Sequence, residues 1–147
     1  MRLGQLLYIS DAKEAMSSVD LTRLVTKCGR KNSDCNVTGL LLYSAGHFIQ
    51  LLEGHLPLLE NLFAKISRDS RHHNIQLLHF GACTQRLFPT WQMGLLNMDD
   101  IDALNRPRLL ELANRLNQHP DGKTIASVFG EFRRQLPAWS VETERVA

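Results

Sequence analysis

A nine-residue segment between two glycines, residues 46–54 (GHFIQLLEG), constrains the fold more than any other part of the chain. Its neighbouring side chains alternate between two largely apolar faces, which predicts a central strand covered on both sides. Gln50 breaks the pattern, because it shares its face with Phe48 and Leu52. A buried amide left without partners costs about 1–3 kcal/mol. The sequence therefore predicts a polar partner for Gln50 inside the fold: a side chain, a water molecule or a ligand.

The segments around this strand predict an α+β fold. Apolar runs rich in strand formers indicate strands at 5–10, 37–43 and 75–80, and an edge strand at 91–96. Helical spacing indicates one helix that starts at 17–20 and ends near Gly29, before a polar loop at 30–36, and a second that opens at Leu56 and Pro57. This order matches a ferredoxin-like βαββαβ sheet with an added fifth strand and two helices on one face.

The last third of the chain predicts a cover for the other face of the sheet. Acidic residues at 99–102 indicate the start of one helix, and apolar spacing indicates another from Thr124 to about Leu136, stopped by Pro137. The polar tail that follows is expected to fray. We therefore expect a core domain at 1–98 and a two-helix cap with its tail at 99–147.

Composition argues against several classes of protein. Seventeen Lys and Arg against fifteen Asp and Glu give a net charge of +2, too mild to indicate direct binding of nucleic acid. Cys28, Cys35 and Cys83 lack the spacing of a zinc site, and the adjacent His72 and His73 do not indicate a metal by themselves. Without a signal peptide or a membrane-spanning run, a cytoplasmic protein is expected.

Five motifs follow one another in the first hundred residues: LLYIS at 6–10, VTGLL at 37–41, FIQLLEG at 48–54, DSRHH at 69–73 and WQM at 91–93. In this order they resemble the BLUF family, a bacterial family that senses blue light with a flavin. The resemblance implies FAD, with FMN or riboflavin in some preparations, between the two helices on the sheet. The chain's length and final helices resemble the short members of the family, which lack a fused output enzyme.

The resemblance also implies roles for single residues. Tyr8 and Gln50 match the photoactive pair, and Trp91 and Met93 match the mobile strand that relays the signal. The matched cofactor-binding positions are Tyr8, Leu24, Asn32, Leu41, Phe48, Gln50, Lys65, Ile66, Asp69, Arg71 and His72. Three positions depart from the usual pattern: Cys28 replaces a frequent serine, Lys31 an asparagine or histidine, and Asn36 a glycine.

The implied function is that of a photoreceptor and not of an enzyme. Light would move an electron and a proton from Tyr8 toward the flavin, and their return would leave Gln50 rotated or tautomerised. The change would bias the strand with Trp91 and Met93, and then the C-terminal helices. With no output domain expected, the signal would reach a downstream protein or alter self-association, and we expect a homo-oligomer.

Two other functions stay open on the sequence. One is an enzyme on the same frame, such as an acylphosphatase-like hydrolase or a flavin reductase, although the phosphate-binding Gly-rich loop of the hydrolase is missing near residues 5–10. The other is an interaction module that keeps the fold but binds no flavin.

Overall fold

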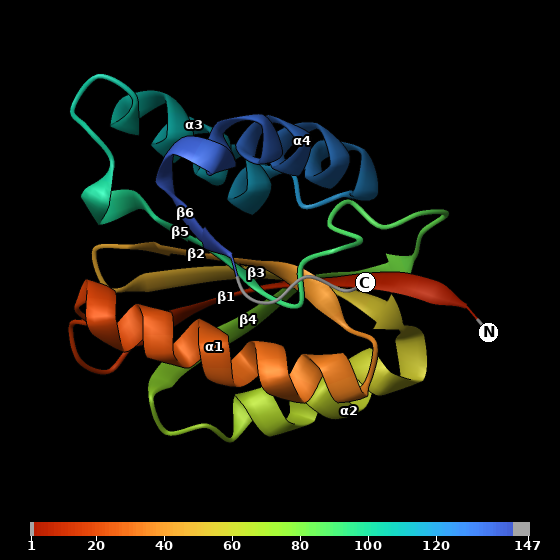
Figure 1. Cartoon of the computed structure of the whole chain (residues 1–147). Coiled ribbons are helices and arrows are strands. Elements are labelled where there is room, and N and C mark those ends of the chain that lie inside the picture. The colour runs from red at the N-terminus through yellow and green to blue at the C-terminus, as the bar shows by residue number, and fades with distance from the viewer. Residues whose placement is uncertain (1, 143–147) are drawn as a thin grey trace.

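A computed structural model of the chain describes residues 2–142, apart from the side chains of residues 33 and 135–142. The strands form one six-stranded sheet in the order β4-β1-β3-β2-β5-β6, with helices on either side (Figure 1). All neighbouring strands are antiparallel except β2 and β5, which are parallel. The strands are β1 (Leu3–Ala12), β2 (Thr38–Ser44), β3 (His47–His55), β4 (His72–Ala82), β5 (Gly94–Asn97) and β6 (Ser140–Glu142).

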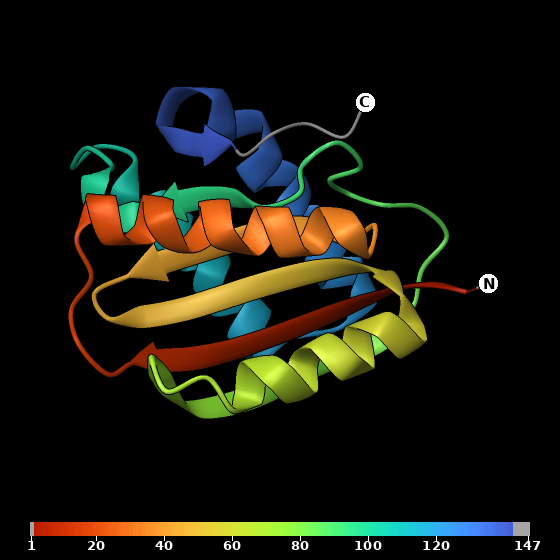
Figure 2. The ribbon, with the colours of Figure 1, turned by 60° about the horizontal axis from the view of Figure 1, so that its bottom comes forward.

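The helices are divided between the two faces of the sheet. Helices α1 (Ser18–Asp34) and α2 (Leu56–Ser67) lie on one face, where β1 and β3 can be seen between them (Figure 2). A short 3-10 helix, η1 (Met98–Asp100), leads to α3 (Arg106–Gln118) and α4 (Gly122–Trp139), which lie on the other face. The predicted α+β fold, with its fifth strand and its helical pair on each face, is confirmed.

Each face of the sheet has its own buried core. Leu52 and Tyr8 belong to the inner core, between the sheet and the α1–α2 layer. Leu51 and Phe129 belong to the outer core, between the sheet and the α3–α4 layer. Adjacent residues of β3 thus face opposite cores, as the alternation of its sequence predicts.

Helix α1 begins as predicted but ends later. Its start is capped by Ser17, whose Oγ accepts a hydrogen bond of 3.1 Å from the backbone N–H of Asp20, while Asp20 Oδ2 accepts one from the N–H of Ser17. The predicted end at Gly29 is wrong. A glycine inside a helix lowers stability by only about 1 kcal/mol relative to alanine, and Gly29 is buried within the helix here. The chain leaves the helix at Asn36, which has a positive φ of 54°.

The C-terminal half differs from the prediction at three boundaries. Helix α3 begins at Arg106 rather than at 99–102, because Asp102 Oδ1 accepts hydrogen bonds from the N–H groups of Leu104 and Asn105 and so closes a turn first. Helix α4 continues past Pro137 to Trp139, since proline removes one backbone hydrogen bond but keeps a helical φ.

The last strand is the third difference. Strand β5 begins at Gly94 instead of 91 and ends at Asn97 instead of 96, and it is not an edge, because β6 pairs with it on its outer side. No pattern in the sequence indicated β6, and the rest of the predicted fraying tail, residues 143–147, lies outside the described residues. The domain boundary at residue 98 stays a prediction. None of the helices within residues 2–142 is long and apolar enough to cross a membrane.

The outer core should be essential for stability. Phe129 on α4 is fully buried, so Phe129→Ala should lower the free energy of unfolding by about 3–5 kcal/mol through lost burial and the cavity it leaves. Urea unfolding followed by circular dichroism measures this change. The control is Ser127→Ala on the exposed side of the same helix, expected within about 0.5 kcal/mol of the wild type. A loss below 1 kcal/mol for Phe129→Ala would contradict the packing described.

Candidate functional site

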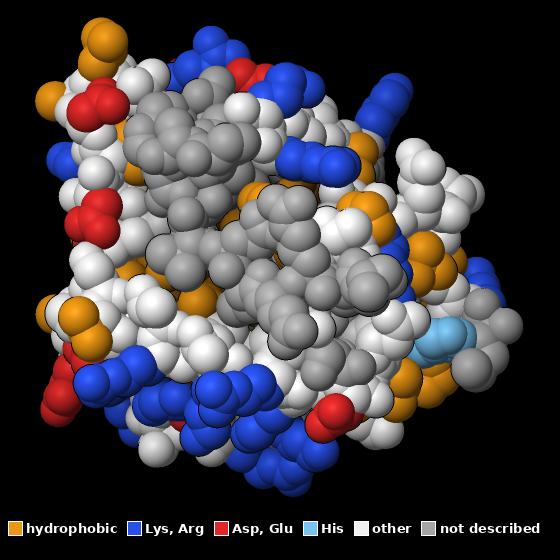
Figure 3. Space-filling model, viewed as in Figure 1, with side chains coloured by type: hydrophobic (Ala, Val, Ile, Leu, Met, Phe, Trp, Pro, Cys, Tyr) orange, Lys and Arg blue, Asp and Glu red, His pale blue; other side chains and the backbone are white. Residues whose placement is uncertain are grey.

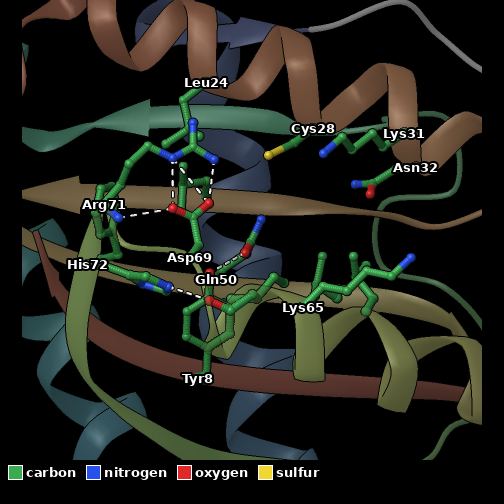
Figure 4. A pocket seen from close by; sticks show the side chains of 15 residues that line it. Tyr8, Leu24, Cys28, Lys31, Asn32, Gln50, Lys65, Asp69, Arg71 and His72 are labelled. Carbon is green, nitrogen blue, oxygen red and sulfur yellow. Dashed lines mark hydrogen bonds and ion pairs between the residues drawn. The ribbon is translucent and has the colours of Figure 1, made fainter.

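The register of β1 and β3 places Tyr8 directly opposite Gln50. Both side chains point to the inner face, where the Tyr8 hydroxyl donates a hydrogen bond of 2.5 Å to Gln50 Oε1 (Figure 4). Gln50 Nε2 lies 3.3 Å from the sulfur of Met93. The polar partner predicted for Gln50 is therefore a neighbouring side chain, the phenol of Tyr8.

Chemistry fixes the direction of this chain of hydrogen bonds. A thioether sulfur can only accept, so the amide nitrogen of Gln50 faces Met93 and its oxygen is left for Tyr8. Burial raises the pKa of Tyr8 well above that of a free phenol, because it disfavours the charged form. Tyr8 is therefore a neutral donor at physiological pH.

A cavity opens above this pair, between α1 and α2. The space between its walls is about 850 Å³, including the part open to solvent. The structure brings all eleven predicted cofactor-binding residues to its lining, with four more that were not in that set. The additional residues are Cys28, Lys31, Leu52 and Leu62. Leu52 could have been found from its place on the face of Gln50, and Leu62 from the apolar stripe of α2.

Asp69 and Arg71 form the ion pair that borders the cavity. The carboxylate of Asp69 accepts from the backbone N–H of Arg71 at 3.0 Å and from its guanidinium at 2.5–3.1 Å. These bonds hold the pKa of Asp69 at about 2 and raise that of Arg71. Lys65 shares the lining of the cavity, but the partner of Asp69 is Arg71.

His72 is held in one orientation by two hydrogen bonds. Its Nε2 lies 2.7 Å from the carbonyl oxygen of Ile66, which can only accept, so this nitrogen carries the hydrogen. Its Nδ1 lies 2.7 Å from Ser10 Oγ and accepts from that hydroxyl when the ring is neutral. With both nitrogens engaged, His72 offers the cavity its ring surface, and it fastens the end of α2 to β1.

Asn32 and Met93, but not Trp91, join the site to the segment before β5. Asn32 Nδ2 donates to the backbone oxygen of Gln92 at 2.9 Å, and the buried Met93 reaches Gln50. Trp91 lies outside the cavity lining and packs in the outer core, where it stacks on Phe88 with ring centroids 5.7 Å apart. The structure therefore brings Met93, but not Trp91, to the predicted photoactive pair.

The mouth of the cavity carries positive charge. Lys and Arg side chains gather along the lower side of the molecule, where α1 and α2 lie (Figure 3). Lys31 and Lys65 are exposed and line the cavity from these two helices. Such a rim suits an anionic group that projects from a buried ring.

The residues present fit a flavin dinucleotide. Leu24 on α1 and Ile66 on α2 give apolar walls for a flat ring, and Gln50 and Asn32 bring amide groups to its polar edge. The basic rim matches the phosphates. Within residues 2–142, no cluster of three or more His, Cys, Asp or Glu could hold a metal ion.

Comparison with known families gives an independent result. Residues 3–94 match the model of the BLUF family, described as sensors of blue-light using FAD. The beta subunit of a photoactivated adenylate cyclase from Euglena longa is 38% identical over 87 residues, 59% of this chain. The blue light- and temperature-regulated antirepressor BluF of Escherichia coli (strain K12) is 34% identical over 96 residues, 65% of this chain. The matches cover only 10% of the cyclase subunit and 24% of BluF.

Solved structures agree with this match. The dark state of the BLUF protein BlrB is similar with a TM-score of 0.69 and 31% identity, over 86% of this chain and 96% of that one. A bacterial light-regulated adenylyl cyclase has a TM-score of 0.68 and 27% identity, over 88% of this chain and 39% of that one. BlsA in its ground state has a TM-score of 0.69 at 24% identity, over 99% of this chain and 91% of that one, which supports the fold alone.

The raised pKa of Tyr8 predicts resistance to alkali. We expect no ionisation of Tyr8 between pH 7 and pH 10, since burial keeps the phenol neutral where a free tyrosine begins to ionise. The tyrosinate absorbance near 295 nm, titrated in the wild type and in Tyr8→Phe, isolates Tyr8 as the difference between the two curves. A difference that grows to half its final value below pH 10 would contradict the burial of this hydroxyl.

Proposed function

The chain belongs to the BLUF family of blue-light sensors that use FAD, and from this premise we propose that it is a non-enzymatic switch centred on Tyr8 and Gln50. The observation that carries the proposal is the single line of hydrogen bonds from Tyr8 through Gln50 to Met93, at the bottom of a cavity that fits a flavin. Each of these three residues is less than 5% exposed, so water does not compete with the line.

FAD, when bound, supplies a ring that absorbs blue light and then accepts an electron. Tyr8 is the group placed to supply that electron, and it releases the proton of its hydroxyl along the bond to Gln50 Oε1. When Tyr8 regains both, Gln50 is left rotated or tautomerised. The neutral phenol makes this cycle possible, because a phenolate would have no proton to release.

Gln50 is suited to hold two states of similar energy. Its amide nitrogen and oxygen have nearly the same shape, so rotation by half a turn exchanges a donor for an acceptor without a packing change. In the orientation described here, the amide nitrogen faces the weak acceptor of Met93. The rotated amide would lose this contact and donate toward Tyr8, so the choice between the states depends on where Met93 lies.

The output is proposed to pass through the segment before β5 to the C-terminal helices and from there to a downstream protein. E. coli BluF is described as an antirepressor, which supports action on a partner protein. Klebsiella pneumoniae BlrP1 is described with FMN, which supports the second flavin expected for this chain. Assembly into a homo-oligomer and its change in light belong to the same proposal.

The first test is the absorption spectrum of the purified protein before and after a blue flash. We expect a flavin spectrum that moves slightly to the red and returns in the dark, because Gln50 changes its hydrogen bond to the ring. A flavin spectrum that ignores light would contradict the switch. A colourless protein that refuses added FAD would favour the interaction module, and turnover of acyl phosphate or of NADH in the dark would favour an enzyme.

Two substitutions test the residues of the switch. Tyr8→Phe removes the transferable proton and Gln50→Ala removes the rotating amide, so both should abolish the flash-induced shift while flavin still binds. The matched control is Tyr43→Phe, because Tyr43 is a buried tyrosine of the same inner core that does not line the cavity. It should keep a normal shift. A normal photocycle in either of the first two variants would overturn the mechanism.

A further inference from the structure

Glu53 is a buried acidic residue that the proposed photochemistry does not use. The residue is 0% exposed, and its side chain lies on the outer face of β3, the face opposite to that of Gln50. The carboxylate accepts hydrogen bonds from the backbone N–H groups of Leu87 at 2.9 Å and Phe88 at 2.9 Å, and from Gln5 Nε2 at 3.1 Å. These bonds compensate for burial of the charge and tie residues 87 and 88 to the central strand.

Two of the three donors to Glu53, Leu87 and Phe88, belong to a short connecting segment, residues 86–93, which we call the link. Arg86 adds a second fastening at its start. Its guanidinium donates to Thr38 Oγ1 at 2.8 Å and to the backbone oxygens of Glu53 at 2.9 Å and Asn36 at 2.7 Å. The link is thus held at one end by the β2–β3 hairpin, through directed and charge-assisted hydrogen bonds.

The pocket end of the link contacts the photoactive pair. Gln92 accepts from Asn32 through its backbone oxygen, and Met93 contacts Gln50. Trp91 is fixed to β2 by its backbone oxygen, which accepts from the N–H of Gly39 at 3.1 Å. The position of Met93 against Gln50 therefore depends on where the whole link lies.

The other end of the link contacts α4. The ring of Phe88 packs against Phe129 with centroids 6.0 Å apart, and the backbone oxygen of Leu87 accepts from the Arg133 guanidinium at 3.0 Å. Both residues that Glu53 holds therefore contact the helix. The link is a continuous physical connection between the pocket and the outer helical layer.

We propose that Glu53 is a positioning residue of the light switch: its carboxylate fixes the link so that Met93 stays against Gln50, and it thereby sets the lifetime of the lit state. This inference rests on the proposed function, since a lifetime exists only if light produces the second state. Glu53 is not among the residues that line the cavity, and its proposed effect passes through the link.

The direction of the effect follows from the contact with Met93. The sulfur accepts from Gln50 Nε2 and so stabilises the orientation in which Oε1 faces Tyr8. If the link is loosened, Met93 lies against Gln50 Nε2 for less of the time. The orientation with Oε1 toward Tyr8 is then stabilised less, so Gln50 returns to it less readily. We therefore expect dark recovery to become slower when the anchor is weakened.

The test is Glu53→Gln, which has the same shape but only one acceptor oxygen. The N–H of Leu87 bonds to both carboxylate oxygens, so either orientation of the new amide turns its NH₂ group toward a donor. The variant should therefore lose part of the bonding to Leu87 and Phe88 without creating a cavity. Flash spectroscopy of the flavin-loaded protein, well below its melting temperature, should show the normal red shift and a recovery about fivefold slower. That factor corresponds to about 1 kcal/mol, the typical net contribution of one hydrogen bond.

The matched control is Gln5→Met. It removes the third donor to the same carboxylate from β1, yet it leaves both bonds from Glu53 to the link in place. This variant should lower the melting temperature while recovery stays within about twofold of the wild type. A purely structural role of Glu53 would instead give both variants the same recovery rate.

A second variant keeps the inference open to refutation if Glu53→Gln does not fold. Arg86→Lys retains the charge but loses the planar guanidinium that donates several hydrogen bonds to the hairpin, so it should also slow recovery. Wild-type recovery in either folded variant, with the shift intact, would overturn the role of the anchor. An absent shift in the wild type would instead overturn the proposed function itself, so the two failures can be told apart.

Discussion

The hydrogen bond between Tyr8 and Gln50 depends on a single register between β1 and β3. Side chains of a strand alternate between faces, so a slip by one residue would turn Gln50 toward the outer core and carry Ile49 or Leu51 into the pocket. The two apolar cores make such a slip costly, because every side chain of the strand would change sides. The packing of ordinary hydrocarbon on both faces is thus what keeps the phenol and the amide within bonding distance.

The sheet separates the pocket from the outer helical layer, and the link passes from one side to the other just before β5. Trp91 lies with the outer core, and Met93, two residues later, lies with the inner core. Gly94 permits this passage, because a Cβ at that position would come within 2.5 Å of the Trp91 ring. A movement that begins at Gln50 therefore needs no route through the packed strands.

The sequence predicted the layers of the fold well because apolar periodicity is a direct consequence of burial. It also predicted that Gln50 needs a partner, and the family motifs indicated Tyr8. It failed at Gly29, since a glycine is compatible with both a helix interior and a helix end, and only tertiary packing decides between them. The bonds of Glu53 could not be predicted, because its partners are backbone groups more than thirty residues away.

The sequence also left open whether Trp91 turns toward the pocket or away from it, and the structure packs it on Phe88 in the outer core. A motif shows which residue occurs at a position. It does not show on which side of the sheet the Trp91 side chain of an irregular segment will pack. The eleven lining residues that the family resemblance implied, by contrast, lie on helices and strands or next to them, and all of them face the cavity.

The contacts of the link with both Gln50 and α4 impose a thermodynamic reciprocity. If light changes the affinity of α4 for a partner by some factor, the partner must change the balance between the two orientations of Gln50 by the same factor. Binding at the far side of the molecule would therefore be visible as a change in the colour and the persistence of the flavin signal. The chromophore would report on its own partner, without any label.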